Sequence, residues 1–147
     1  MNYQQYINKH LVEKSTKLEQ MVFFGQNIEA GSRLSGLSKN LHSVNGAVAI
    51  NTTNCENTMV GIGMGLMEQG VPATYLVKQL DFLMLGIDQL TNTYNVLRGK
   101  SIKAPFNIVT IVVDGGYGGP QNALNNLYDF CSISRIPGYT ISNKLDA

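Results

Sequence analysis

The sequence has little charge. Only 14% of its 147 residues are charged, with 11 basic and 10 acidic side chains and a net charge of +1. A typical globular chain has about 25% charged residues, so we expect another chain to cover part of this surface. The balanced charge provides no basic surface for nucleic acid or for an anionic membrane.

The sequence also lacks a disulfide framework, a membrane span and a signal peptide. Two cysteines, Cys55 and Cys131, are too few for a disulfide scaffold. No apolar run approaches the roughly 18 residues of a membrane span, and charges such as Lys9 interrupt the N-terminal segment. We therefore expect a cytoplasmic chain with a single domain over residues 1–147.

Metal ligands are scarce as well. The two histidines, His10 and His42, have no metal-ligand spacing with Cys, Asp or Glu, so no metal site is expected. Cys55 has no basic neighbour that would lower its pKa. We interpret it as a small, buried apolar residue.

Short apolar segments alternate with helical patterns along the chain. The expected strands are 21–24, 48–50, 74–77, 108–113 and 139–142, and the expected helices are 2–20, 37–41, 55–69, 82–97 and 121–130. The continuous apolarity of 108–113 indicates a strand buried on both faces, as in parallel sheets. The sequence therefore predicts an α/β domain, with three α/β/α layers around a mainly parallel sheet. Ligands in such folds bind beyond the carboxyl ends of the strands.

The helix expected over 55–69 contains three glycines, Gly61, Gly63 and Gly65. Each costs roughly 1 kcal/mol relative to alanine inside a helix, so together they indicate close backbone packing. The contact is either internal or a subunit interface. Glu56 opens this helix at the carboxyl edge of the sheet, where it is either a capping charge that favours the helix dipole or a site residue.

Glu56 followed by Gly61-Ile62 and Gly65-Leu66 forms a pattern that resembles a known family. It is similar to the pyrimidine-binding domain of thiamine diphosphate enzymes, where a glutamate precedes a Gly-apolar-x-x-Gly-apolar helix. The wider resemblance is to the transketolase-like group, particularly the beta subunit of the first component of 2-oxo acid dehydrogenases. It covers nearly the whole chain and includes residues 51–56 and 87–89.

The resemblance implies a set of site residues. Glu56 would be catalytic, donating a hydrogen bond to N1′ of the aminopyrimidine and so favouring the tautomer that removes the C2 proton. Gln79 stands where the family has an aromatic that stacks on the aminopyrimidine, and Phe82 lies one turn further on. Asn122 replaces a family histidine, and Asn27 lies where the family has acidic side chains.

The resemblance also implies a partner. The chain lacks the Gly-Asp-Gly…Asn motif with which a separate domain of the family holds the diphosphate and Mg²⁺. We therefore expect a separate diphosphate-binding, alpha-type chain, in a heterotetramer with two copies of each. Because the sequence stops near the fifth expected strand, we expect it to lack the last helix and strand of the family's domain, and its C-terminal domain.

Two functions remain open from the sequence. The first is a cofactor-binding subunit of an enzyme of ketol transfer, or of 2-oxo acid decarboxylation with acyl transfer. The alternative is a non-catalytic interaction subunit that retains the fold without cofactor chemistry, in keeping with the replacements at Gln79 and Asn122.

Overall fold

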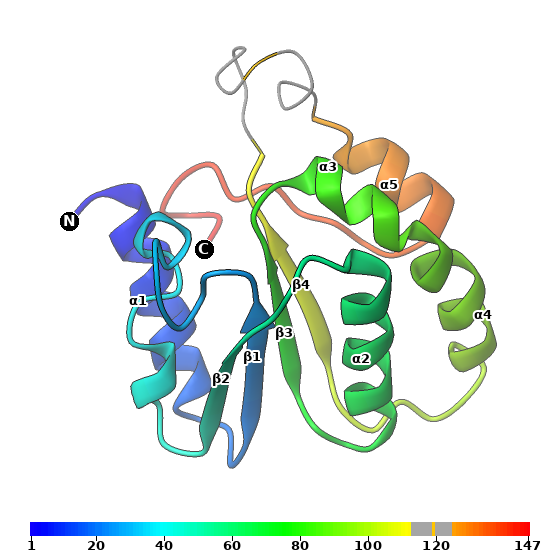
Figure 1. Ribbon diagram of the computed structural model, residues 1–147, viewed down its shortest axis with the longest axis horizontal. Helices are drawn as coiled ribbons and strands as arrows, with labels where there is room; N and C mark the ends of the chain where they lie inside the picture. The colour runs from blue at the N-terminus through cyan, green and yellow to red at the C-terminus, as the bar shows by residue number, and fades with distance from the viewer. Residues whose placement is uncertain (113–118, 120–124) are drawn as a thin grey trace.

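The computed structural model, which describes residues 1–112, 119 and 125–147, has a parallel sheet at its centre (Figure 1). Its strands are β1 (Met21–Gly25), β2 (Ala47–Asn51), β3 (Ala73–Val77) and β4 (Phe106–Thr110). They lie in the order β2-β1-β3-β4, and each neighbouring pair is parallel. The α/β class predicted from the sequence is therefore confirmed.

Helices cover both faces of this sheet. In chain order they are α1 (Tyr3–Ser15), η1 (Leu34–Gly36), η2 (Leu41–Ser43), α2 (Glu56–Glu68), α3 (Leu80–Leu83), η3 (Met84–Gly86), the π-helical turn η4 (Gln89–Thr93), α4 (Tyr94–Leu97) and α5 (Leu127–Ser134). Figure 1 shows α1 on one side of the sheet and α2, α3, α4 and α5 on the other. The three-layer arrangement is thus present in the described part of the chain.

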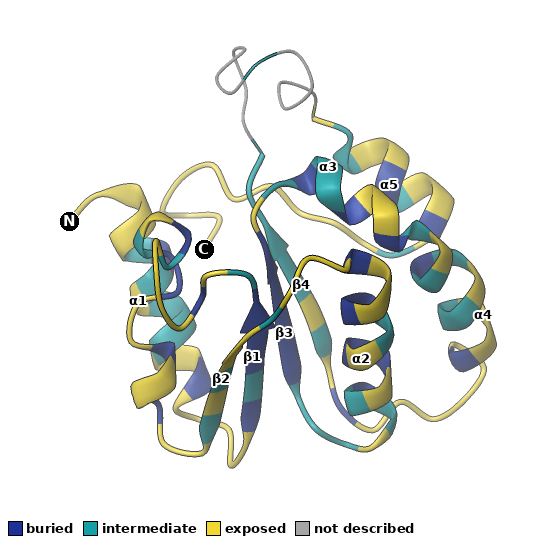
Figure 2. Cartoon of the chain, viewed as in Figure 1, coloured by how far each residue is buried: buried dark blue, intermediate teal, exposed yellow. Residues whose placement is uncertain are grey.

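The sheet separates two hydrophobic cores (Figure 2). Neighbouring side chains of a strand point to opposite faces, so Phe24 joins the core under α2 while Phe23 joins the core under α1. We call these the α2-face core and the α1-face core. Their main buried members are, respectively, Phe24, Met59, Val60, Tyr75, Leu80 and Leu83, and Ile7, Phe23, Ile28, Leu34, Leu41 and Leu76.

Three predicted elements differ from the structure. The helix expected over 82–97 starts at Leu80 and passes through a 3-10 and a π-helical turn before it ends at Leu97. The helix expected over 37–41 is wrong, because two short 3-10 turns flank that segment instead. The strand expected over 139–142 is also wrong, since these residues pair with no strand among those described.

Element bounds also shift at the end of the sheet. The strand expected over 108–113 corresponds to β4, which starts at Phe106 and ends at Thr110, and residue 113 lies outside the described residues. The carbonyl oxygen of Ile111, just after β4, accepts a hydrogen bond from Leu80 N–H at 3.1 Å. The helix expected over 121–130 overlaps α5, and its residues 121–124 lie outside the described residues. Within the described ranges, no helix combines the length and apolar character required to cross a bilayer.

Candidate functional site

The strand connections define a crevice at one end of the sheet. The chain leaving β1 passes along the α1 face, where Ile28 and Leu34 are buried in the α1-face core. The chain leaving the adjacent strand β3 instead enters α3 on the α2 face. In parallel sheets, ligands bind where two neighbouring strands diverge in this way, beyond their carboxyl ends. The candidate site therefore lies between the ends of β1 and β3.

Glu56 is buried at this end of the sheet. It is the first residue of α2, only 9% of its surface is exposed, and the preceding Cys55 provides no side-chain cap for the helix. A carboxylate in the first turn interacts favourably with the helix dipole. A glycine lets the next helical segment approach this turn closely, because a Cβ on Gly86 would lie 2.8 Å from Val60 and 3.2 Å from the Glu56 carbonyl oxygen.

Tyr75 of β3 brings a phenol to the same place. Its ring stacks on Phe24, with centroids 5.1 Å apart and an angle of 8° between the planes. Burial, and to a smaller extent the charges of Glu56 and Cys55, raise the pKa of Tyr75 to about 12. The phenol is therefore neutral at physiological pH and is a hydrogen-bond donor.

Tyr75 was not among the site residues expected from the sequence. It lies within a strand whose five residues are all buried, and Glu56 belongs to α2, which packs over this strand. The sequence signal for Tyr75 is a tyrosine in the middle of an expected buried strand. Buried tyrosines usually place their hydroxyl at a polar partner.

Two further hydroxyls at this end of the sheet are buried and unpaired. The Oγ1 atoms of Thr52 and Thr110 have no hydrogen-bond partner among the described residues. Thr52 continues the β2 ladder through its N–H, which donates to the Gly25 carbonyl oxygen at 3.0 Å, and Thr110 is paired with Val77 at the end of β4. Buried polar groups are nearly always hydrogen-bonded, so the carboxyl edge has hydrogen-bonding groups that the described residues do not use.

Gln79 and Phe82 lie at the carboxyl end of β3. Gln79 has extended backbone angles at the N-cap of α3, and its carbonyl oxygen accepts a hydrogen bond from Phe82 N–H at 3.3 Å. Both side chains are half-buried, and Phe82 packs against the α2-face core. The structure therefore places these two residues on the same sheet face as Glu56.

Asn27 occupies a different part of the crevice. It is exposed, with a left-handed φ of 56°, in the turn after β1. The side-chain oxygen of Asn51 fixes this turn by accepting hydrogen bonds from the N–H groups of Ile28 and Glu29 at 2.9 and 3.0 Å. Since Ile28 enters the α1-face core, Asn27 belongs to the α1 side of the crevice. Asn122 lies outside the described residues.

The interpretation of Cys55 as a buried apolar residue is wrong. Cys55 is exposed, because its non-helical φ of −156° at the N-cap position places it just outside the packed helix. Its sulfur lies 3.0 Å from Thr58 Oγ1. Hydrogen bonds from the side chain and backbone of Thr58 hold the pKa of the Cys55 thiol below its usual value.

The glycines of α2 have different surroundings. A Cβ on Gly63 would overlap the ring of Phe106 on β4, and one on Gly61 would contact Gln89 at 3.7 Å. The internal contact that the sequence left open is therefore present at these two glycines. A Cβ on Gly65 would meet no atom within 4 Å, and this residue faces outwards.

Apolar residues are exposed on α2 and on the edge strand β2. Ile62 is 45% exposed, and Val48 and Ile50 of the edge strand β2 are 53% and 46% exposed. Strands of parallel sheets are usually covered on both faces. We call Val48, Ile50, Ile62 and Gly65 the α2 shelf.

Comparisons with known proteins do not identify a family for this chain. No protein-family model matches the chain, and no curated protein has a significantly similar sequence. Within residues 1–112, 119 and 125–147, no three His, Cys, Asp or Glu side chains form a group that would hold a metal ion. The site is thus defined by its geometry alone: a buried carboxyl group, a neutral phenol and unpaired hydroxyls at the carboxyl edge of a parallel sheet.

Proposed function

We propose that the chain is the pyrimidine-binding subunit of a two-chain thiamine diphosphate-dependent enzyme. Its partner is a separate alpha-type chain that holds the diphosphate and Mg²⁺, in a heterotetramer with two copies of each. The observation that carries this proposal is Glu56, a buried carboxyl group that opens α2 at the carboxyl edge of the sheet. The Glu56-glycine helix resemblance and the strand order support it.

The described residues suit the aminopyrimidine half of this cofactor. An aminopyrimidine is flat and apolar on its faces and has nitrogen donors and acceptors on its edge. The site offers the Glu56 carboxyl group, the unpaired Thr52 hydroxyl and the half-buried Phe82 ring. Gln79 and Asn27 border the same crevice. None of these side chains is a cation, so the diphosphate is assigned to the partner chain.

Each residue has a defined task in this proposal. Glu56 would form the hydrogen bond to N1′ of the aminopyrimidine. Burial keeps water away from this hydrogen bond, which is stronger in a low-dielectric site. Tyr75 is a neutral hydrogen-bond donor on the strand beneath α2. The bound cofactor supplies a nucleophilic thiazolium carbon for ketol transfer, or for 2-oxo acid decarboxylation with acyl transfer.

The second candidate is a non-catalytic interaction subunit. The exposed apolar residues of the α2 shelf favour it, because exposed apolar surface is typical of protein–protein contacts. Gln79 in place of the stacking aromatic is consistent with lost cofactor binding. Both candidates require a partner chain, so only cofactor chemistry separates them.

The deciding experiment compares two glutamates of the same helix. The chain is co-purified with its candidate partner, and proton exchange at the cofactor's C2 is measured with wild type, Glu56→Gln and Glu68→Gln. A positioned acid-base group contributes about 10²–10⁴-fold, so Glu56→Gln should slow exchange by this factor. Glu68 is the matched control, because it lies at the far end of α2 and pairs with Lys100 at 3.1 Å.

Retained assembly by light scattering shows that the variants are folded. If Glu56→Gln and Glu68→Gln exchange at the wild-type rate in an intact complex that binds the cofactor, Glu56 is only a capping charge. If the intact complex binds no thiamine diphosphate with Mg²⁺, the interaction subunit is the correct function.

A further inference from the structure

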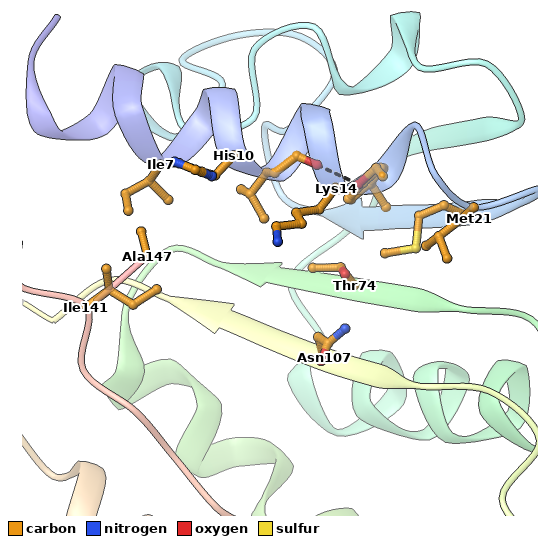
Figure 3. A pocket seen from close by; sticks show the side chains of 12 residues that line it. Ile7, His10, Lys14, Met21, Thr74, Asn107, Ile141 and Ala147 are labelled. Carbon is orange, nitrogen blue, oxygen red and sulfur yellow. Dashed lines mark hydrogen bonds between the residues drawn. The ribbon is translucent and has the colours of Figure 1, made fainter. Parts of the chain in front are cut away.

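A groove of about 390 Å³ opens on the α1 face, between α1 and the sheet (Figure 3). Its apolar lining includes Leu11 of α1, Leu18 just after this helix, and Met21 and Phe23 of β1, and Ile141 of the C-terminal tail borders it. This volume is within the range of small-molecule pockets, roughly 300–1,000 Å³. The groove lies on the sheet face opposite Glu56 and is separate from the candidate site.

Two polar side chains lie together on the floor of the groove. Thr74 of β3 and Asn107 of β4 are register partners, and both line the groove. Thr74 is only 3% exposed as a whole residue, yet it lines the groove, so its hydroxyl is available there as a hydrogen-bonding group.

A cationic side chain faces these two residues from α1. Figure 3 shows the Lys14 side chain extending from α1 towards β3, across from Thr74 and Asn107. His10 and the last residue, Ala147, also line the groove, and no aspartate or glutamate side chain does so among the described residues. An ammonium group, an amide N–H and a hydroxyl are all donors, and together they are complementary to a carboxylate.

We propose that this groove binds an amphipathic carboxylate with a medium-length alkyl chain. The carboxylate accepts hydrogen bonds from Lys14, Thr74 and Asn107, and the alkyl chain lies along the apolar side chains of α1 and β1. The site needs neither Glu56 nor a partner chain, so it is independent of the proposed cofactor function.

The test is calorimetric titration of the chain with octanoate. The expected result is saturable binding of one octanoate per chain, with much weaker binding of octanol, which lacks the charge, and of acetate, which lacks the alkyl chain. Lys14→Met should weaken octanoate binding about tenfold, the effect of losing a hydrogen bond to a charged group. Lys17→Met is the matched control, since Lys17 is exposed just beyond the end of the same helix and does not line the groove.

Thr74→Val separates binding from folding. It keeps the shape of the side chain and removes only the hydroxyl, so octanoate binding should weaken several-fold while the melting temperature does not fall. The proposal is wrong if octanol binds as tightly as octanoate, if Lys14→Met and Lys17→Met behave alike, or if no saturable binding occurs. A dimer that dissociates on Lys14→Met would assign the groove to a second copy of the chain and overturn it as well.

Discussion

Helices α1 and α2 are both 13 residues long, but they owe their stability to different interactions. In α1, a capping box joins Asn2 and Gln5 by reciprocal hydrogen bonds of 2.9 and 3.0 Å, and Lys9 pairs with Glu13 one turn apart. These are local signals, and the helix buries only Ile7 and Ser15.

In α2 the local signals are weak and the packing is strong. The helix has no side-chain cap and contains three glycines, which lower its intrinsic helix propensity. It buries Glu56, Met59, Val60, Gly63, Met64 and Met67. Because α2 is held by tertiary contacts, those contacts also determine where its first turn lies. The candidate site therefore lies on the helix whose geometry the whole α2-face core determines.

The largest expected effect tests the packing of α2 directly. Gly63→Ala places a methyl group where the ring of Phe106 lies, and overpacking of this kind costs about 1–3 kcal/mol. Urea denaturation should show this loss in the free energy of unfolding. The double variant with Phe106→Leu should recover part of it, because the smaller side chain leaves room for the methyl group. An increase in stability with Gly63→Ala alone would show that α2 behaves as a propensity-limited helix like α1.

The same contrast explains how far the sequence predicts the fold. Continuous apolarity predicts the buried strands, and the segment order predicts parallel pairing around them. The exact bounds depend on partners instead: β4 starts at Phe106 because that residue pairs with Ala73. Residues 139–142 have suitable β-propensity but no described strand beside them, and Tyr139 remains 84% exposed.

The candidate site also has a part that the sequence predicts and a part that depends on tertiary packing. The position of Glu56 at the start of a helix is predictable, because the hydrophobic period changes from that of a strand to that of a helix at this boundary. The neighbours of Glu56 are not predictable, since Tyr75 and Gly86 reach it only through the packing of β3 and η3 against α2. The exposure of Cys55 likewise depends on its backbone angles at the N-cap.

A smaller effect is expected for the local signals of α1. Asn2→Ala removes the side chain that accepts a hydrogen bond from Gln5 N–H, which should lower the free energy of unfolding by about 1 kcal/mol. Asn2→Asp is the control, because aspartate caps as well as asparagine and should leave stability unchanged. If Asn2→Ala has no effect on urea denaturation, α1 is also held by its tertiary contacts and the contrast between the helices is wrong.

The smallest expected effect concerns the outward face of α2. Gly65→Ala should stabilise the free chain by about 0.5–1 kcal/mol, because alanine is the better helix former and a Cβ at this position meets no atom within 4 Å. A loss of stability would show that the position is crowded. Gly65→Leu extends the test to the α2 shelf: it should leave the free chain folded and weaken co-purification with the partner chain. Full assembly with Gly65→Leu would place the partner elsewhere. A glycine that destabilises its own helix while facing open space is explained if a partner backbone packs against it.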